Sequence, residues 1–396
     1  MSNIFNPQQK ILCHSKKLKS FFNNQNPYPI TVEIDPSNAC NHSCPFCISG
    51  HIHLSKYKGT ELFNRTMLSA DVLKNLREDL VKTDINAINW TGGGEPTMNP
   101  HLKDTIQYIK NNSKIKMGMF SNGSMMEKFD LYETFVKCLD WIRISIDAGN
   151  EDSYNNLRVT NNSNNFKVVI TNIKKLIKKK KETNSNLTIG VGFVVTKDNY
   201  NEIEEFVDTF KNIEVDYCQF KPEIIQIERS GNIDREKEQI SCDFWVQKVV
   251  ELLDLAKNKL GNKFECNSYK IEDLIVDAKN YGRNYRMCLG SQFQPCIGAD
   301  GNVYVCTNHR GHKKYSYGNL NKNSFTSIWK DLDKRDEIMN LINNKEKFSK
   351  CTHLCKPHES NKMLWNIKEN YKDSYIDDLN SKFKNINAKI KHKDFI

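Results

Sequence analysis

Residues 30 to 221 alternate six times between a strand-like segment and an amphipathic helical segment. This alternation constrains the fold most, because β/α repeats place parallel strands in one sheet with right-handed crossover helices. Six repeats predict an α/β fold in which a parallel sheet closes partly into a barrel. The loops after the carboxyl ends of such strands carry the chemistry. The expected strands are Ile30–Ile34, Ala87–Trp90, Ile115–Phe120, Trp141–Ile146, Leu187–Val195 and Tyr217–Phe220.

A chain of 396 residues is long enough for two or three domains, at about 150 residues each. The alternation stops after Pro222, and a helical segment follows that Ser241 begins and Gly261 ends. Five cysteines then lie within Cys288–Cys355, and the chain after His358 is helical and charged. The expected divisions are an N-terminal segment (1–28), the barrel (29–221), a helical connector (222–285), a cysteine-rich domain (286–356) and a helical tail (357–396).

Charge and cysteine content limit the classes of function. The net charge is +10, but the run Lys178–Lys181 ends an amphipathic helix, where cations suit the negative end of the helix dipole. We therefore do not expect nucleic acid as a partner. No apolar run reaches the roughly 18 residues of a membrane helix, and no signal-peptide core is present. These features predict a cytoplasmic protein with no membrane partner, whose thirteen cysteines include metal ligands.

Three cysteines follow the first expected strand at the spacing C-x3-C-x2-C: Cys40, Cys44 and Cys47. A loop can wrap three thiolates within eight residues around one metal centre. Three ligands on a cubane [4Fe–4S] cluster leave one iron open for a substrate or cofactor. A structural zinc ion requires a fourth ligand nearby. His42 could supply it, so a zinc hairpin is the alternative.

The cysteine spacing, with Phe46 before the last cysteine, resembles the signature of radical S-adenosylmethionine (SAM) enzymes. Three further segments follow successive strands in the order of that family: Gly93-Gly94-Glu95-Pro96, Ser121-Asn122-Gly123 and Ile144–Gly149. The resemblance covers residues 29–221 and implies a partial (β/α)6 TIM-type barrel. It also implies reductive cleavage of SAM to methionine and a 5′-deoxyadenosyl radical, which abstracts hydrogen from a C–H bond.

The resemblance also implies the roles of individual residues. Cys40, Cys44 and Cys47 are expected to hold the cluster with the open iron. The glycine segment is expected to meet the amino group of SAM, and the segment after the fourth strand to lie near its ribose and carboxylate. Arg158 is a further candidate for the carboxylate. The expected SAM-binding residues are Phe46, Gly93, Gly94, Glu95, Ser121, Asn122, Ser145, Asp147 and Arg158.

Alternation along the sixth strand predicts which of its side chains face the barrel lumen. Gln219 and Lys221 point inward, and Cys218 points outward. Gln219 and Lys221 are therefore candidates to contact the substrate. For Lys221 the alternative is an ion pair that only supports the structure.

The second group of cysteines reads Cys288-x12-Gly301-x4-Cys306, followed by Cys351-x3-Cys355. The dipeptide at Gly301, Asp-Gly, predicts a hairpin turn that brings the flanking cysteines together. The pattern resembles the auxiliary-cluster domains of the SPASM/Twitch group of radical SAM enzymes. With no cysteine after Cys355, the shorter Twitch version with one auxiliary [4Fe–4S] cluster fits better.

Four thiolates would leave no iron of this cluster open, which favours electron transfer or structural support. A zinc site built from the same four cysteines is the alternative. Cys296 is the fifth cysteine of the region. It is either a thiol near the substrate, a substitute ligand or a buried side chain.

The resemblance to single-cluster relatives predicts a small polar substrate such as a sugar, aminocyclitol or nucleotide sugar. The reaction would be dehydrogenation by an oxidoreductase, or epimerisation, with reduced ferredoxin or flavodoxin as electron donor. Residues 1–28 are also fewer than the peptide-recognition domain of many peptide-modifying relatives. Peptide or protein maturation is the alternative. An iron–sulfur electron carrier is the non-enzyme alternative, but it leaves the three segments after the strands unexplained.

Overall fold

The computed structural model describes residues 7–160, 162–196, 198–222, 243–260, 265–267, 284–349, 351, 355–387 and 390–396. In these residues ten strands form one sheet in the order β10-β9-β8-β1-β2-β3-β4-β5-β6-β7. The strands are β1 (Thr31–Ile34), β2 (Ala87–Trp90), β3 (Lys116–Ser121), β4 (Trp141–Ser145), β5 (Thr188–Val195), β6 (Tyr217–Pro222), β7 (Glu265–Asn267), β8 (Cys296–Ile297), β9 (Asn302–Tyr304) and β10 (Ser316–Asn319).

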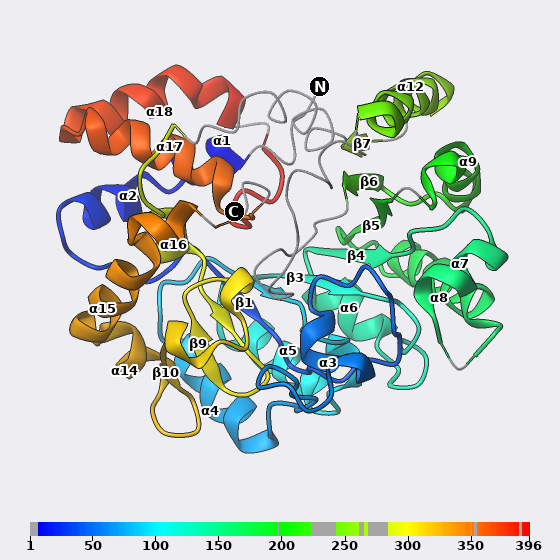
Figure 1. Cartoon of the computed structure of the whole chain (residues 1–396), viewed down its shortest axis with the longest axis horizontal. Coiled ribbons are helices and arrows are strands. Elements are labelled where there is room, and N and C mark those ends of the chain that lie inside the picture. Colours follow the sequence, from blue (N-terminus) through cyan, green and yellow to red (C-terminus); the bar gives the residue numbers. More distant parts are fainter. Residues whose placement is uncertain are drawn as a thin grey trace.

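Strands β1 to β7 are parallel in chain order and form the wall of an open barrel, with helices on its outer face (Figure 1). The helices that follow these strands are α3 (Gly50–His53), α4 (Ala70–Leu80), α5 (Leu102–Asn112), α6 (Tyr132–Cys138), α7 (Glu151–Arg158), α8 (Asn165–Glu182), α9 (Ile203–Ile213) and α12 (Asp243–Leu260). The six expected strands and the partial barrel are confirmed. The expected ends of the connector helix, Ser241 and Gly261, lie outside the described residues.

The strands place apolar side chains outside and polar side chains inside, as expected. On β4 the outward Ile142 and Ile144 are fully buried under the helices, whereas the lumen-facing Arg143 and Ser145 are partly exposed. On β6 Cys218 is buried in the same outer core, as the alternation predicts. The barrel interior is therefore lined by polar groups at mid-height.

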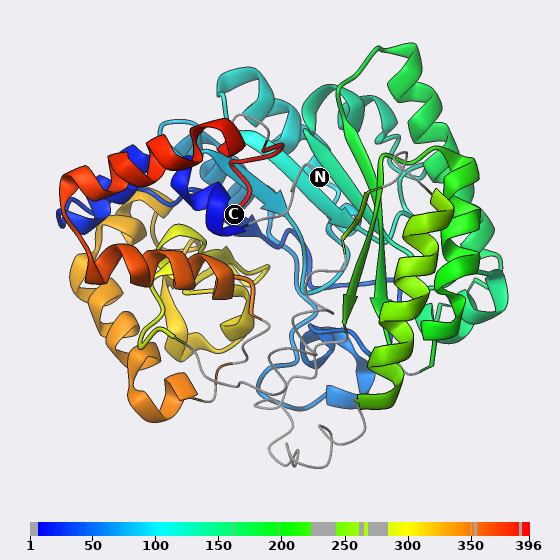
Figure 2. The same cartoon turned by 90° about the horizontal axis from the view of Figure 1, so that it is seen from above.

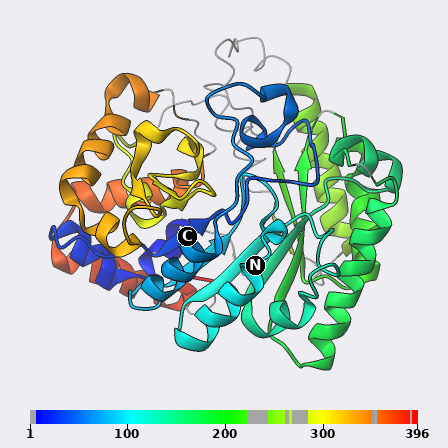
Figure 3. The same cartoon turned by 90° about the horizontal axis from the view of Figure 1, so that it is seen from below.

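The cysteine-rich domain extends the barrel sheet. Strand β8 pairs in parallel with β1, with Cys296 opposite Glu33, and β8 and β9 form the predicted hairpin. Gly301 in its turn has φ +81°, a conformation that glycine adopts readily. Figures 2 and 3 show this domain in yellow and orange on the β1 side of the sheet, opposite the green helices. Its helices are α14 (Phe325–Lys330), α15 (Leu332–Asn343) and α16 (Lys345–Ser349).

Both ends of the chain pack beside this domain (Figure 1). Their helices are α1 (Pro7–Leu12), α2 (Ser15–Phe22), α17 (His358–Glu369) and α18 (Asp373–Asn387). They share an apolar core that includes Leu18, Phe293 and Leu364. No helix among the described residues is long and apolar enough to span a lipid bilayer.

After α18 the last residues return to the barrel and cover the amino-terminal ends of its strands. Thr31 Oγ1 donates to Asp394 O (2.7 Å), and Gln294 Nε2 donates to Ile396 O (2.5 Å). The Phe395 ring meets Trp141 edge-on at 5.5 Å between ring centroids. Residues 390–396 therefore close the lower end of the lumen, and we call them the C-terminal plug.

Lys10 joins α1 to this plug by donating to Phe395 O (3.0 Å). This contact leaves the Lys10 side chain buried at the plug.

Burial lowers the pKa of Lys10 from 10.5 to about 7. Between about pH 7 and pH 10.5, Lys10 is protonated in the unfolded chain but neutral in the folded protein. Raising the pH removes this difference, so Lys10 makes the free energy of unfolding increase with pH. We expect Lys10→Met to reduce the gain in unfolding free energy between pH 7 and about pH 9, measured by urea denaturation. The partly exposed Lys19 is the control, and equal slopes in K10M and wild type would contradict the prediction.

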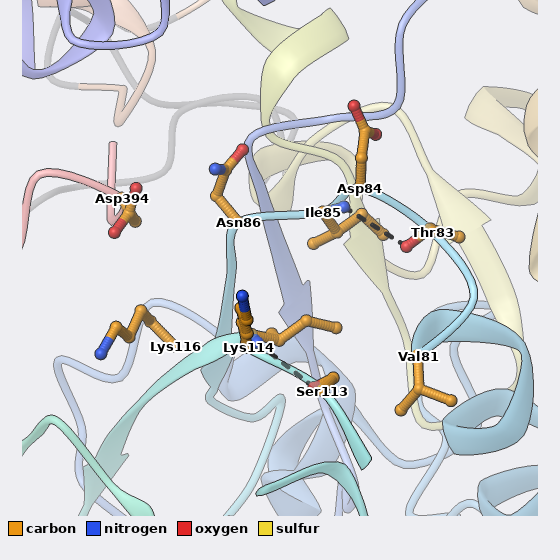
Figure 4. A pocket seen from close by; sticks show the side chains of 10 residues that line it. Val81, Thr83, Asp84, Ile85, Asn86, Ser113, Lys114, Lys116 and Asp394 are labelled. Carbon is orange, nitrogen blue, oxygen red and sulfur yellow. Dashed lines mark hydrogen bonds between the residues drawn. The ribbon is translucent and has the colours of Figure 1, made fainter.

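A shallow pocket of about 310 Å³ lies at the same end of the barrel (Figure 4). Asn86, Lys116 and Asp394 are among its lining residues. It lies at the amino-terminal ends of β2 and β3, whereas the cysteine loop leaves the carboxyl end of β1. The pocket is therefore at the opposite end of the barrel from the expected chemistry.

Candidate active site

The loop after β1 brings the first three cysteines together. Cys44 is buried, and Cys40 and Cys47 are partly exposed. Hydrogen bonds from Cys47 N to Cys44 O (3.2 Å) and from His42 N to Cys40 Sγ (3.4 Å) hold the loop in tight turns. Burial and the neighbouring Cys44 raise the pKa of Cys47 to about 11. Because metals bind thiolates, loading of this site has to release thiol protons.

His42, the fourth ligand of the zinc alternative, is engaged elsewhere. Its Nε2 lies 3.0 Å from Asn165 Nδ2, and its ring meets Tyr154 edge-on. Among the described residues, no three His, Cys, Asp or Glu side chains are spaced to hold a single metal ion. His42 is therefore not placed as a fourth ligand, and the three thiolates of the loop remain as the donor set.

The glycine segment after β2 passes directly beneath the start of the cysteine loop. Gly94 N donates to Ser37 O (3.0 Å), and Glu95 N donates to Ala39 O (2.9 Å). A Cβ atom at Gly94 would lie 2.1 Å from Ala39 O, and one at Gly93 would lie 2.2 Å from Asn38 Oδ1. Only glycine permits this approach, so the two segments are fixed to each other next to Cys40.

We expect Gly94→Ala to destabilise the fold, because the carbonyl of Ala39 would have to move to admit the new methyl group. The loss in unfolding free energy should be about 3 kcal/mol by urea denaturation. Gly192→Ala is the control, because its Cβ would meet Arg143 at an ordinary 3.5 Å. Equal stability losses in G94A and G192A would contradict this account of the close approach.

Glu95 joins the glycine segment to the segment after β3. It is buried and accepts hydrogen bonds from Ser121 Oγ (2.8 Å) and Asn122 N (2.7 Å). Thr97 donates to the same carboxylate through its backbone and its hydroxyl. Burial raises the pKa of Glu95, and these hydrogen bonds oppose that rise. The structure therefore brings Glu95, Ser121 and Asn122 together, and their contacts with SAM stay a prediction.

Arg158 and Asp147 form a buried ion pair behind the cysteine loop. Arg158 Nη1 lies 3.5 Å from Cys44 Sγ, and its guanidinium lies 6.0 Å from the centre of the Phe46 ring. Asp147 accepts a hydrogen bond from Val194 N on β5 (2.7 Å). Both side chains therefore support the loop that carries Cys44. A contact of Arg158 with the SAM carboxylate stays a prediction, as does the role of Ser145.

The second group of cysteines gathers from separate segments. Cys288 N donates to Asn343 Oδ1 (2.7 Å), which ties this cysteine to α15. Burial raises the pKa of Cys306 to about 12, and the nearby Cys288 and Cys351 contribute to the rise. Cys355 lies just before α17 and is partly exposed. The convergence of Cys288, Cys306 and Cys351 suits one metal centre, while its full ligand set stays a prediction.

The lumen-facing candidates lie around Phe120 on β3. Gln219 accepts a hydrogen bond from Arg143, whose guanidinium lies 4.3 Å from the centre of the Phe120 ring. Lys221 Nζ lies 6.0 Å from the same ring centre, and Lys356 Nζ lies 5.9 Å from it. Gln219 and Lys221 therefore face the lumen together, as predicted.

Several neighbours of the site were not predicted from the sequence. His53 Nε2 lies 3.4 Å from Cys47 Sγ, and Arg310 reaches the same loop from the cysteine-rich domain. Lys356 forms an ion pair with Glu33 of β1. Only their positions in the fold distinguish these residues, because each type of side chain is common in the chain. Cys296, by contrast, was a candidate from the sequence, and the structure places it fully buried, with Arg310 Nη2 3.8 Å from its sulfur.

Two protein-family models match the chain. The radical SAM superfamily model covers residues 34–210, and the SPASM iron–sulfur cluster-binding domain model covers residues 288–356. Among curated proteins, the chain is 24% identical over 311 residues to the tungsten-containing aldehyde ferredoxin oxidoreductase cofactor-modifying protein of Pyrococcus furiosus. That match covers 75% of this chain and 79% of the relative.

Three other curated relatives are matched over less than two thirds of their own length. The match covers 18% of the GTPase Obg of Brachyspira hyodysenteriae and 37% of a UPF0026 protein of Helicobacter pylori. It covers 59% of the radical SAM cyclopropyl synthase TigE of Paramaledivibacter caminithermalis.

Solved structures share the fold. SuiB of Streptococcus suis bound to S-adenosylmethionine has a TM-score of 0.58 at 16% identity, covering 83% of this chain and 71% of that chain. The structure of anSMEcpe with bound AdoMet has a TM-score of 0.56 at 16% identity, covering 92% of this chain and 98% of that chain. The matched families span both groups of cysteines, and they imply a [4Fe–4S] cluster, SAM and auxiliary iron–sulfur binding. The chain therefore carries a radical SAM superfamily domain followed by a C-terminal SPASM iron–sulfur cluster-binding domain.

Proposed function

We propose that this enzyme oxidises a small polar molecule of the sugar, aminocyclitol or nucleotide-sugar type. The observation that carries the proposal is the lining of the lumen between the cysteine loop and the C-terminal plug. Its side chains are mostly polar or charged at mid-height, and Phe120, Arg143 and Lys221 are partly exposed to solvent there. Such a lining suits a ligand with many hydrogen-bonding groups.

Hydrogen-bond donors and acceptors alternate among the side chains that line the barrel lumen. Asn89 Nδ2 donates to Glu33 Oε1 (2.7 Å), and Arg143 donates to Gln219 on the opposite part of the sheet. The aromatic face of Phe120 lies between them and suits the apolar face of a sugar ring. These side chains would bind and orient the substrate, so that one of its C–H bonds faces the cofactor.

SAM, when bound, supplies the radical that removes this hydrogen atom. Cys40, Cys44 and Cys47 would hold the cluster, and the plug excludes water from below. Oxidation then requires the substrate to lose one more electron and a proton, and an iron–sulfur cluster held by the auxiliary cysteines would accept that electron. Return of hydrogen by Cys218 or Cys296 is disfavoured, because Cys218 faces the outer core and Cys296 is fully buried.

A second candidate is the modification of a peptide or protein. The fold is shared with SuiB bound to its precursor peptide SuiA (TM-score 0.57) and with anSMEcpe bound to the Cp18Cys peptide (TM-score 0.51). The partly exposed lumen side chains could hold one amino-acid side chain of such a peptide.

The test is 5′-deoxyadenosine formation by anaerobically reconstituted, dithionite-reduced enzyme. Small-molecule and macromolecular fractions of an extract from the source organism are added separately. We expect stimulation by the small-molecule fraction, and Lys221→Met should remove it while Lys178→Met, on the exposed face of α8, should not. Stimulation by the macromolecular fraction alone would replace the first proposal with the second. No stimulation by either fraction would contradict both.

A further inference from the structure

Arg310 belongs to the SPASM-type domain but acts in the radical SAM domain. It follows Cys306 by four residues, directly after the short 3-10 helix Thr307–His309. Only 6% of the residue is exposed. The backbone is therefore anchored next to an expected auxiliary-cluster ligand, while the guanidinium reaches Ser49 in the loop of the first three cysteines.

The guanidinium contacts three separate segments around the SAM site. Nη1 donates to Ser49 Oγ (2.7 Å), two residues after Cys47, and lies 3.3 Å from Gly92 O in the glycine segment. Nε pairs with Asp35 Oδ2 at 2.5 Å, at the point where β1 leads into the cysteine loop. One side chain thus ties together both ends of the cysteine loop and the segment beneath it.

The positive charge also acts on the ligand itself. The hydrogen bond of Arg310 to Ser49 places its guanidinium two residues along the chain from the expected ligand Cys47. A cation favours the state in which the cluster carries the additional electron, because that state is more negative. In a buried setting, where water screens little, this interaction is stronger than on a surface.

We propose that Arg310 is a positioning residue through which the auxiliary domain fixes the Cys47 loop and raises the reduction potential of the SAM-binding cluster. The proposal does not depend on the identity of the substrate. It implies that the SAM-binding cluster becomes easier to reduce when the auxiliary domain is folded and docked.

Lys356 provides a matched comparison. It also comes from the auxiliary region, directly after Cys355, and forms an ion pair with Glu33 of β1. Glu33 precedes Asp35 by two residues on the same face of the strand. Both cations therefore join the two domains through β1, but Arg310 also hydrogen-bonds beside Cys47.

The experiment is a redox titration of the anaerobically reconstituted full-length protein, followed by electron paramagnetic resonance. The signal that changes when SAM is added identifies the SAM-binding cluster. We expect Arg310→Gln to lower the ratio of reduced to oxidised SAM-binding cluster about tenfold at a given potential, a shift of 59 mV for one electron. Arg310→Lys should restore most of the potential. Lys356→Gln should leave the midpoint at the wild-type value.

Ser49→Ala keeps the charge but removes its anchor, so it should give a smaller shift of the same sign. It also keeps the proposal testable if Arg310→Gln does not fold. Unchanged midpoints in both R310Q and S49A would overturn the proposal. An equal shift in K356Q would also overturn it, because the effect would then come from domain docking in general.

Discussion

Replacement of Cys44 by alanine should abolish 5′-deoxyadenosine formation, even without substrate. Cys44 is the most buried of the three loop cysteines, and Arg158 Nη1 lies 3.5 Å from its sulfur atom. Two remaining thiolates cannot keep a cubane with one open iron in place. The iron content should fall from about eight to about four atoms per chain, assuming two cubane clusters.

Cys138 on α6 supplies the control for this prediction. It is a buried cysteine in the outer core, so Cys138→Ala should keep both the iron and the SAM cleavage. Iron is measured colorimetrically and 5′-deoxyadenosine by chromatography. Full SAM cleavage by C44A would show that Cys44 is not a ligand of the SAM-binding cluster.

Simultaneous replacement of Cys288 and Cys306 should separate SAM cleavage from product formation. These cysteines lie near each other in the SPASM-type domain, and together with Cys351 they form the predicted auxiliary site. Iron should again fall from about eight to about four atoms per chain. Uncoupled SAM cleavage should persist, because the cysteine loop is intact, whereas substrate oxidation should stop for lack of an electron acceptor.

Iron content has to be compared with both SAM cleavage and product formation in this double variant. Loss of SAM cleavage with iron near eight atoms would contradict the assignment of Cys288 and Cys306 as ligands. Continued product formation with iron near four would show that the auxiliary cluster does not accept the electron. The variant also has to be compared with Cys138→Ala, to separate cluster loss from the general cost of removing a buried thiol.

The barrel could be predicted from the sequence because its signal is local. Each strand alternates or runs apolar over several residues, and the observed β2 has the predicted bounds Ala87–Trp90. The cysteine loop and the segments at Glu95, Asn122 and Asp147 were predicted from the resemblance of their motifs to the radical SAM family, in the order in which they follow successive strands. The hairpin at Gly301 was predictable from its turn residues.

The contacts between distant segments could not be predicted in this way. Strand β8 is only two residues long, too short for any periodicity, and its pairing with β1 is visible only in three dimensions. The C-terminal plug was expected to belong to a helical tail, yet Phe395 and Ile396 are buried at the barrel. The ion pairs of Arg310 and Lys356 join residues that lie more than two hundred positions apart.

The pairing of β8 with β1 also limits how the molecule can move. A swing of the auxiliary domain away from the barrel would break main-chain hydrogen bonds such as Asp35 N to Ile297 O (2.8 Å), together with the buried Arg310–Asp35 ion pair and the partly buried Lys356–Glu33 ion pair. Such a hinge is costly, so the two cluster sites keep a fixed separation during turnover. An electron that passes from a substrate in the lumen to an auxiliary cluster would therefore tunnel over a constant path, and its transfer rate should not depend on solvent viscosity.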